Sequence, residues 1–183
     1  MQIIDLTADN ENAIQQTARI MLEVFRETAP GWANTMDEAA KEVRESFDTG
    51  HISRIAVDDN GDVLGWIGGI EEYDGFTWEL HPLAVHPAHQ RKGIGRALVQ
   101  DLEKQVRQRG GLNIMLGTDD ETNRTSLGGK DLYPNILEYI RDIQNYDNHP
   151  YSFYQKLGYV IVGVIPDANG HGKPDILMAK RLD

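Results

Sequence analysis

The chain has 183 residues, 40% of them hydrophobic and 26% charged, which is typical of one folded domain and excludes a wholly disordered or collagen-like chain. It carries 18 basic and 29 acidic residues, a formal net charge of −11, and this argues against a nucleic-acid-binding protein, which usually presents a basic patch. Cysteine is absent, so disulfide bonds, thiolate metal sites and a cysteine nucleophile are excluded.

Apolar runs in the sequence are too short for a membrane-spanning helix. The longest reach about ten residues, around Tyr159–Ile165, whereas a helix needs roughly twenty to cross a bilayer. Residues 1–6 show neither the basic region nor the apolar stretch of a signal peptide. We therefore expect a cytoplasmic protein with neither a membrane nor a nucleic-acid partner.

The first half of the chain predicts a strand, two helices and a three-stranded meander. Apolar residues recur at helical spacing in the two helices, and the Ala29-Pro30-Gly31 segment ends the first of them. The Asn60-Gly61 and Asp74-Gly75 pairs are turn signals between the strands. The expected elements are a strand at 1–6, helices at 11–28 and 36–47, and strands at 53–57, 63–70 and 76–85.

The second half predicts a strand–helix–strand unit followed by two short helices and two strands. Leu132, Ile136, Ile140 and Ile143 share a helical face, and Asp131 and Pro134 mark its start. The other expected elements are a helix at 93–109, a strand at 112–116, a helix at 150–156, and strands at 159–164 and 174–179. The order indicates one α/β (α+β) domain over residues 1–183, with a mixed central sheet of about seven strands flanked by helices.

A glycine-rich loop, Gln90-Arg91-Lys92-Gly93-Ile94-Gly95, lies between a predicted strand and the long helix. Glycines allow close backbone approach to a ligand, and a helix N-terminus attracts anions, so the loop is suited to a pyrophosphate. Its spacing fits neither a Walker A loop nor the dinucleotide motif. The alternative is a glycine-containing turn surrounded by solvated charges.

Two separated motifs resemble the GNAT superfamily of N-acetyltransferases, and the predicted order of strands and helices matches that family over essentially the whole chain. The motifs are Val85-His86-Pro87 with Gln90-Arg91-Lys92-Gly93-Ile94-Gly95-Arg96-Ala97-Leu98, and Phe153-Tyr154-Gln155-Lys156-Leu157-Gly158-Tyr159. The resemblance implies an enzyme that uses acetyl-CoA as its co-substrate and needs no metal.

The resemblance also implies a role for each part of the predicted cofactor site. The loop would hold the pyrophosphate, and the strand before it would present backbone groups to the pantetheine. The N–H of Leu83 would polarise the thioester carbonyl, and Tyr154 would protonate the leaving thiolate. Without the resemblance, Tyr154 is a core aromatic. The residues expected to bind acetyl-CoA are Leu83, Ala84, Val85, Gln90, Arg91, Lys92, Gly93, Ile94, Gly95, Arg96 and Tyr154.

Glu79, His81 and Leu83 alternate along one predicted strand and so share one of its faces. Glu79 and His81 would lie roughly 7 Å apart. A carboxylate and an imidazole would then stand beside the point of acetyl transfer, although an exposed pair without function has the same pattern. Pro82 within the strand indicates a bulge or an unpaired edge.

Further segments closely resemble the enterococcal-type aminoglycoside 6′-N-acetyltransferases, with the likeness weakest before residue 55. They include Trp78-Glu79-Leu80-His81-Pro82-Leu83, Leu116-Gly117-Thr118-Asp119-Asp120, His149-Pro150-Tyr151 and Gly163-Val164-Ile165-Pro166-Asp167-Ala168-Asn169-Gly170. The resemblance implies a polycationic aminoglycoside substrate and a homodimer. The expected substrate-binding residues are Tyr73, Glu79, Asp119, Asp120 and Glu121. Thr122 stands where the family has another acid, which affects the range of drugs.

The expected reaction is direct attack of the amine on the thioester in a ternary complex. Glu79 or His81 would accept the amine's proton, directly or through water, and Glu79 is first a substrate anchor and second a base. Two alternatives stay open. The acceptor could be a polyamine or a protein amine, since the fold does not determine the acceptor. The chain could also be a CoA-binding regulator without activity, against which Glu79 and Tyr154 argue.

Overall fold

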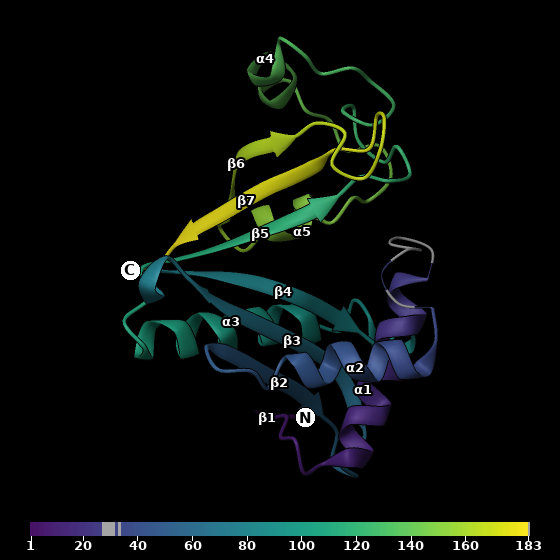
Figure 1. The fold of residues 1–183 in the computed structure, drawn as a ribbon, viewed down its shortest axis with the longest axis vertical. Coiled ribbons are helices and arrows are strands. Elements are labelled where there is room, and N and C mark those ends of the chain that lie inside the picture. Colours follow the sequence, from purple (N-terminus) through teal and green to yellow (C-terminus); the bar gives the residue numbers. More distant parts are fainter. Residues whose placement is uncertain (27–31, 33, 183) are drawn as a thin grey trace. The chain divides into compact units, whose positions relative to one another are not determined.

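The computed structural model describes residues 1–26, 32 and 34–182, shown as a ribbon in Figure 1. The predicted break at 29–31 lies outside these residues. Two compact units are present, one formed by residues 1–114 with Leu182 and the other by Met115–Arg181. That residues 1–183 form one domain stays a prediction.

The strands of the first unit form an antiparallel meander of which the sequence predicted the last three strands, and the separately predicted strand at 1–6 joins it as the first. They are β1 (Gln2–Asp5), β2 (His51–Val57), β3 (Val63–Glu72) and β4 (Thr77–Val85). They pair in chain order, and each is antiparallel to its neighbour. The β3–β4 connection is a single 3₁₀ turn at Tyr73–Gly75, so the predicted turn at Asp74-Gly75 is confirmed. A second 3₁₀ turn at Pro87–His89 follows β4.

Three helices belong to this unit, and local capping explains where two of them begin. Helix α1 (Glu11–Phe25) starts at Asn10, whose side chain accepts a hydrogen bond from the N–H of Ala13. Helix α2 (Met36–Glu45) starts with a reciprocal capping box between Thr35 and Glu38. Helix α3 (Ile94–Gln108) starts at Gly93, which has no side chain to cap it. All three helices were expected from the sequence.

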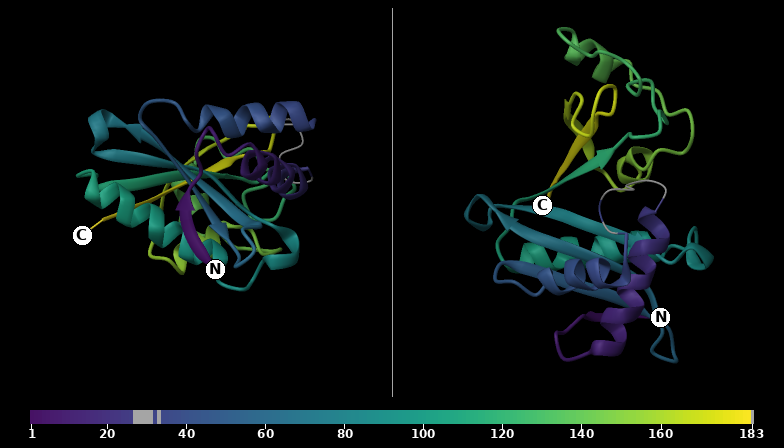
Figure 2. Two further views of the ribbon diagram at one scale, coloured as in Figure 1. Left: turned by 90° about the horizontal axis from the view of Figure 1, so that it is seen from below. Right: turned by 45° about the vertical axis from the view of Figure 1, so that its right-hand side comes forward.

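The helices of the first unit cover both faces of its strands. On one face, Trp66 of β3 is buried in a core with α1 and α2, formed with side chains such as Ile14, Met21 and Val43. On the other face, a Cβ at Gly69 would lie 2.7 Å from the Leu102 side chain of α3. Alternate residues of β3 therefore face different helices, and Figure 2 (left) shows the strands between α2 and α3.

The second unit contains most of β5 (Asn113–Asp119), followed by α4 (Ile136–Arg141), α5 (Tyr151–Gln155), β6 (Val160–Ile165) and β7 (Asp175–Arg181). Strands β6 and β7 form an antiparallel hairpin. Helix α4 is shorter than the sequence predicted. The Asp131 side chain accepts from the N–H of Tyr133, which closes a local turn where the helix was expected to start, and Leu132 is buried outside any helix.

Candidate active site

A bulge interrupts the pairing of β3 with β4. Ile67 pairs with Leu83 and Gly69 pairs with Leu80, so Gly68 alone faces the two-residue segment His81-Pro82. A Cβ on Gly68 would collide with the carbonyl oxygen of His81. The strand can therefore bulge here only because its partner has a glycine, and the bulge predicted from Pro82 is confirmed.

Glu79 is half-buried and His81 is exposed. Glu79 pairs with Ile70 and Leu83 pairs with Ile67, an odd number of residues apart along β3, so the bulge puts Glu79 and Leu83 on opposite faces of the sheet. The prediction that Glu79, His81 and Leu83 share one face is therefore wrong, because it assumed a strand without a bulge.

The His81 ring lies 5.0 Å from the ring of Trp32, measured between centroids. The Trp32 indole donates to Glu42 at 3.2 Å, which ties it to α2. No pattern in the sequence singled out Trp32, because it lies outside any periodic segment.

The loop before α3 is exposed and turns through two residues with positive φ. They are Arg91 (φ 59°) and Gly93 (φ 87°). No atom lies within 4 Å of the position that a Cβ on Gly93 would take, and the first turn of α3 has no side-chain cap. The backbone N–H groups at this helix start are therefore free of protein side chains, as an anionic group such as a pyrophosphate requires.

Tyr73 lies apart from the other predicted residues of β4. It is 70% exposed on the β3–β4 turn. Glu79 pairs with Ile70, which comes three residues before Tyr73 in the chain. Three residues of strand correspond to about 10 Å. Its predicted contact with substrate therefore needs a ligand that reaches from Glu79 to the turn.

The acidic residues at the end of β5 and directly after it differ in their surroundings. Asp119 is exposed and accepts a hydrogen bond from the Asn169 side chain, while Glu121 pairs with Lys173 at 3.2 Å. Asp120 is fully buried. Its carboxylate accepts from the backbone N–H of Arg124 at 2.7 Å, and from the N–H and hydroxyl of Thr125 at 2.8 and 2.7 Å. Direct substrate binding by Asp120 stays a prediction, and these hydrogen bonds give it another role.

Tyr154 is buried in α5, with 7% of its surface exposed. Its ring packs against Phe153 and Tyr159, at centroid distances of 5.1 and 5.7 Å. Burial raises the pKa of the Tyr154 phenol, because the phenolate would lose hydration. The hydroxyl therefore stays protonated near neutral pH, and the raised pKa also makes it a weaker acid than an exposed tyrosine.

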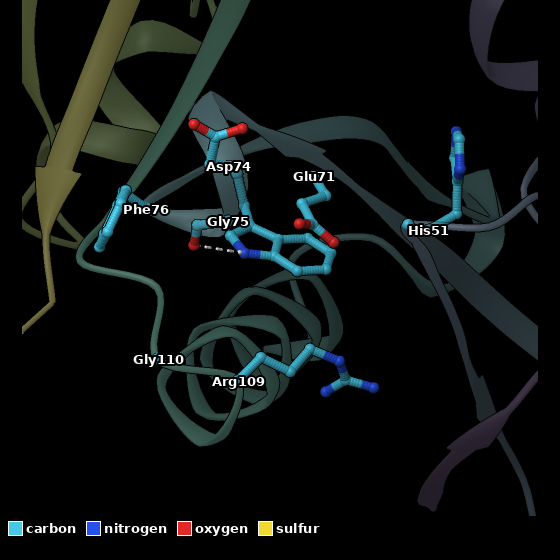
Figure 3. Close-up of a pocket in the computed structure, with 9 residues that line it drawn as sticks. His51, Glu71, Asp74, Gly75, Phe76, Arg109 and Gly110 are labelled. Carbon is cyan, nitrogen blue, oxygen red and sulfur yellow. Dashed lines mark hydrogen bonds between the residues drawn. The ribbon is translucent and has the colours of Figure 1, made fainter.

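A separate cavity of about 520 Å³ lies at the other end of α3 from the glycine-rich loop (Figure 3). The helix has 15 residues, so its two ends are about 22 Å apart. The cavity is lined by charged groups of both signs and contains none of the residues predicted for the site. Its lining residues are Gly50, His51, Glu71, Asp74, Gly75, Phe76, Trp78, Arg109 and Gly110.

Membrane-spanning helices and metal-binding clusters are both absent from the part of the chain that the structure describes. None of its helices is both long enough and apolar enough to cross a membrane. No group of three or more His, Asp or Glu side chains in it is arranged to hold a metal ion.

Residues 18–128 match the acetyltransferase (GNAT) family. The chain belongs to this family. The match confirms the predicted fold class, an α/β fold in which a mixed sheet of seven strands is flanked by helices. Family membership also makes the chain an acetyltransferase.

Two solved GNAT structures are similar to this member along its whole length. One is an aminoglycoside 6′-N-acetyltransferase in complex with coenzyme A, with 42% identity, a TM-score of 0.90, and coverage of 100% of this chain and 98% of the other. The second is the aminoglycoside 6′-N-acetyltransferase of Enterococcus faecium, with 42% identity, a TM-score of 0.88 and the same coverage. The coenzyme A complex is consistent with the predicted co-substrate.

A curated relative has a different substrate in its name. It is an L-methionine sulfoximine/L-methionine sulfone acetyltransferase of Salmonella typhimurium, 37% identical over 76 residues. The aligned segment covers 40% of this chain and 44% of the relative, so the chain matches less than half of that enzyme's length.

Proposed function

We propose that this GNAT enzyme transfers the acetyl group of acetyl-CoA to the 6′-amine of aminoglycosides. The observation that carries the proposal is the 42% identity and TM-score of 0.90 to an aminoglycoside 6′-N-acetyltransferase over the full chain. The half-buried carboxylate of Glu79 beside the β4 bulge supports it, because a polycationic acceptor needs anionic groups near the point of transfer.

Acetyl-CoA would supply the acetyl thioester, and residues of the first unit suit its binding. The uncapped start of α3 would hold the pyrophosphate through the N–H groups of the loop from Gln90 to Gly95. Charges on Arg91, Lys92 and Arg96 would add to the attraction. The backbone of Leu83 to Val85 follows the bulge, and the N–H of Leu83 would hold the thioester carbonyl.

The chemical step needs one proton acceptor and one proton donor. The amine nitrogen forms a bond to the thioester carbon, and the carbon–sulfur bond breaks. Glu79 anchors the ammonium form of the acceptor, and its proton leaves to Glu79 or His81, directly or through water. Tyr154, which is protonated at working pH, gives its proton to the departing sulfur.

The remaining predicted acids belong to the second unit. Asp119 is exposed and could meet an ammonium group in competition with Asn169, whereas Glu121 is already paired with Lys173. The net charge of −11 attracts polycations in general. A homodimer and a cytoplasmic location stay predictions.

A small zwitterionic amine is the second candidate acceptor. The 37% identity to the methionine sulfoximine acetyltransferase favours it, although over only 76 residues. A polyamine, a protein amine and a regulator that binds CoA without activity are further alternatives from the sequence.

A panel of acceptors separates these possibilities. We would measure the release of free CoA thiol with kanamycin, tobramycin, L-methionine sulfoximine, spermidine and a short peptide. Transfer to the two aminoglycosides with the largest kcat/KM supports the proposal. Preferred transfer to the sulfoximine, the polyamine or the peptide would show that this compound represents the substrate class. Binding of acetyl-CoA without transfer to any amine would indicate a regulator.

A further inference from the structure

The segment His149-Pro150-Tyr151 comes directly before α5 and has no role in the proposed reaction. His149 is buried, with 1% of its surface exposed. Its Nε2 lies 3.0 Å from the backbone oxygen of Asp119 at the end of β5. Its Nδ1 lies 3.3 Å from the backbone nitrogen of Tyr151 in the first turn of α5. One imidazole thus bridges the end of β5 and the start of α5.

The two contacts determine which nitrogen of His149 carries the proton. The backbone N–H of Tyr151 can only donate, so Nδ1 must accept. The carbonyl of Asp119 can only accept, so the hydrogen is on Nε2. The bridge therefore requires a neutral imidazole. Burial lowers the pKa of His149, which favours the same form, and the charged groups that act on it are Asp119, Asp120 and Arg124.

The backbone of His149 is held by the side chain of Asn145. Asn145 accepts from the N–H of His149 at 2.8 Å and donates to its carbonyl at 2.9 Å. The same amide donates to the hydroxyl of Ser152 in α5 at 2.7 Å. Both the ring and the backbone of His149 are therefore connected to α5.

The loop before His149 is in turn fastened to the end of β5. The guanidinium of Arg124 donates to the carbonyls of Asp147 and Asn148 at 2.8 and 2.9 Å. The backbone N–H of Arg124 is bound by the buried Asp120 carboxylate. Asp120 is thus connected through Arg124 to the two residues before His149. This structural role is consistent with the burial of the Asp120 side chain.

We propose that His149 is a positioning residue for acetyl transfer, which joins β5 to α5 and thereby sets the place of Tyr154. The proposal rests on the proposed function, in which Tyr154 protonates the leaving sulfur. Tyr154 follows Tyr151 by three residues, one turn along α5, so a shift of the first turn moves its hydroxyl. Asp120 and Asn145 support His149 in this position.

Two substitutions each remove one half of the bridge. His149→Asn keeps an acceptor near the Nδ1 position for Tyr151 and loses the donor to Asp119. His149→Gln keeps a donor near the Nε2 position and loses the acceptor. Misplacement of a reacting group by about 1 Å costs up to roughly 100-fold in rate, so we expect each variant to slow single-turnover transfer about 10–100-fold. The dissociation constant of acetyl-CoA should stay within about twofold, since its proposed pyrophosphate site is the loop from Gln90 to Gly95 at the start of α3.

A double-mutant cycle with Tyr154→Phe shows whether His149 acts through Tyr154. Residues that act as a unit give non-additive losses, so adding His149→Gln to Tyr154→Phe should slow transfer less than about threefold further. If the losses in rate from His149→Gln and Tyr154→Phe multiply in the double variant, the inference is overturned. Transfer at the wild-type rate by both His149→Asn and His149→Gln would also overturn it. If Tyr154→Phe alone transfers at the wild-type rate, the proposed role of Tyr154 fails instead.

A variant of Asn145, whose side chain holds the backbone of His149, gives the same test if neither His149 variant folds. Asn145→Asp keeps the acceptor for the His149 N–H and loses both donors, to His149 and to Ser152. We expect slower transfer, non-additive with Tyr154→Phe, and faster amide hydrogen exchange in α5 with exchange in α3 unchanged. Unchanged exchange in α5 together with unchanged transfer would overturn the coupling.

Discussion

Glu79 is half-buried in β4, two residues before His81 and on the opposite face of the strand from Leu83. Among the residues that the structure describes, no ion pair joins its carboxylate to a basic side chain. Asp120, by contrast, already accepts three hydrogen bonds from its own loop. At the scale of single residues, Glu79 is therefore the carboxylate best suited to anchor a cationic acceptor.

Replacement of Glu79 by glutamine tests this role. Loss of a charge-assisted hydrogen bond costs about 1.5–3 kcal/mol, so Glu79→Gln should lower kcat/KM for kanamycin about 10–150-fold and reduce its salt dependence. Acetyl-CoA affinity should not change. Asp62→Asn, on the exposed β2–β3 turn, removes the same charge as a control. Equal effects of the two variants would show that only net charge matters.

The buried His149 predicts how stability depends on pH. Burial lowers its pKa in the folded protein below the value near 6.5 of an unfolded histidine. The unfolded chain therefore binds the proton first as pH falls, and this contribution to stability, complete above about pH 6.5, is lost towards lower pH, by at most about 1.4 kcal/mol per pH unit. Urea unfolding from pH 7.5 to 5 should show this loss, and His149→Gln should reduce it. An identical pH dependence in the variant would contradict the assignment.

The start of α3 is the element on which cofactor binding depends. Gly93 has φ 87°, and asparagine and aspartate both tolerate this conformation better than other residues. Gly93→Asp places a negative charge where the pyrophosphate would bind, while Gly93→Asn adds the same volume without charge. Calorimetric titration with acetyl-CoA should show no measurable binding to the aspartate variant and weakened binding to the asparagine variant. Equal affinities in the two variants would remove the pyrophosphate from this loop.

The bulge in β4 depends on Gly68 of β3. A methyl group there would meet the carbonyl of His81, so Gly68→Ala should cost about 1–3 kcal/mol in urea unfolding and lower activity. Gly163→Ala in β6 is the matched control, because its new methyl would make only an ordinary contact, 3.8 Å from Leu177. Equal stability of the two variants would mean that the bulge can shift at no cost.

Elements with strong periodicity or clear turn signals could be predicted from the sequence. The meander from β2 to β4 and the helix α3 carry apolar patterns and glycine or asparagine turns, and both were found. The length of helix α4 was overestimated, because the Asp131 side chain closes a turn that competes with a helix start. Local competition of this kind is not visible in the spacing of apolar residues.

Residues of the candidate site were predictable where a motif lies within one element. Gly93 follows from a turn at a helix start. Strand alternation predicted the strand that holds Glu79, but it failed across the bulge, which turns Leu83 to the opposite face. The contacts of His81 with Trp32 and of His149 with Asp119 join residues 49 and 30 positions apart. Such contacts arise from tertiary structure, so periodicity could not reveal them or the burial of Asp120.

At the scale of the whole molecule, family and substrate have different support. The GNAT match and the fold make the chain an acetyltransferase. The proposed substrate depends on the likeness of the full chain to aminoglycoside 6′-N-acetyltransferases, together with a net charge of −11 that suits a polycation. The curated relative that names a small amino-acid analogue matches over only 76 residues.

The position of the acetyl group on the product tests the proposed function most directly. The enzyme would be incubated with acetyl-CoA and kanamycin, and the product analysed by mass spectrometry and two-dimensional NMR. We predict a single acetyl group on the 6′-nitrogen, and no product from an aminoglycoside that has a 6′-hydroxyl in place of the amine. Acetylation at another nitrogen, or no acetylation of kanamycin by enzyme that binds acetyl-CoA, would contradict the assignment.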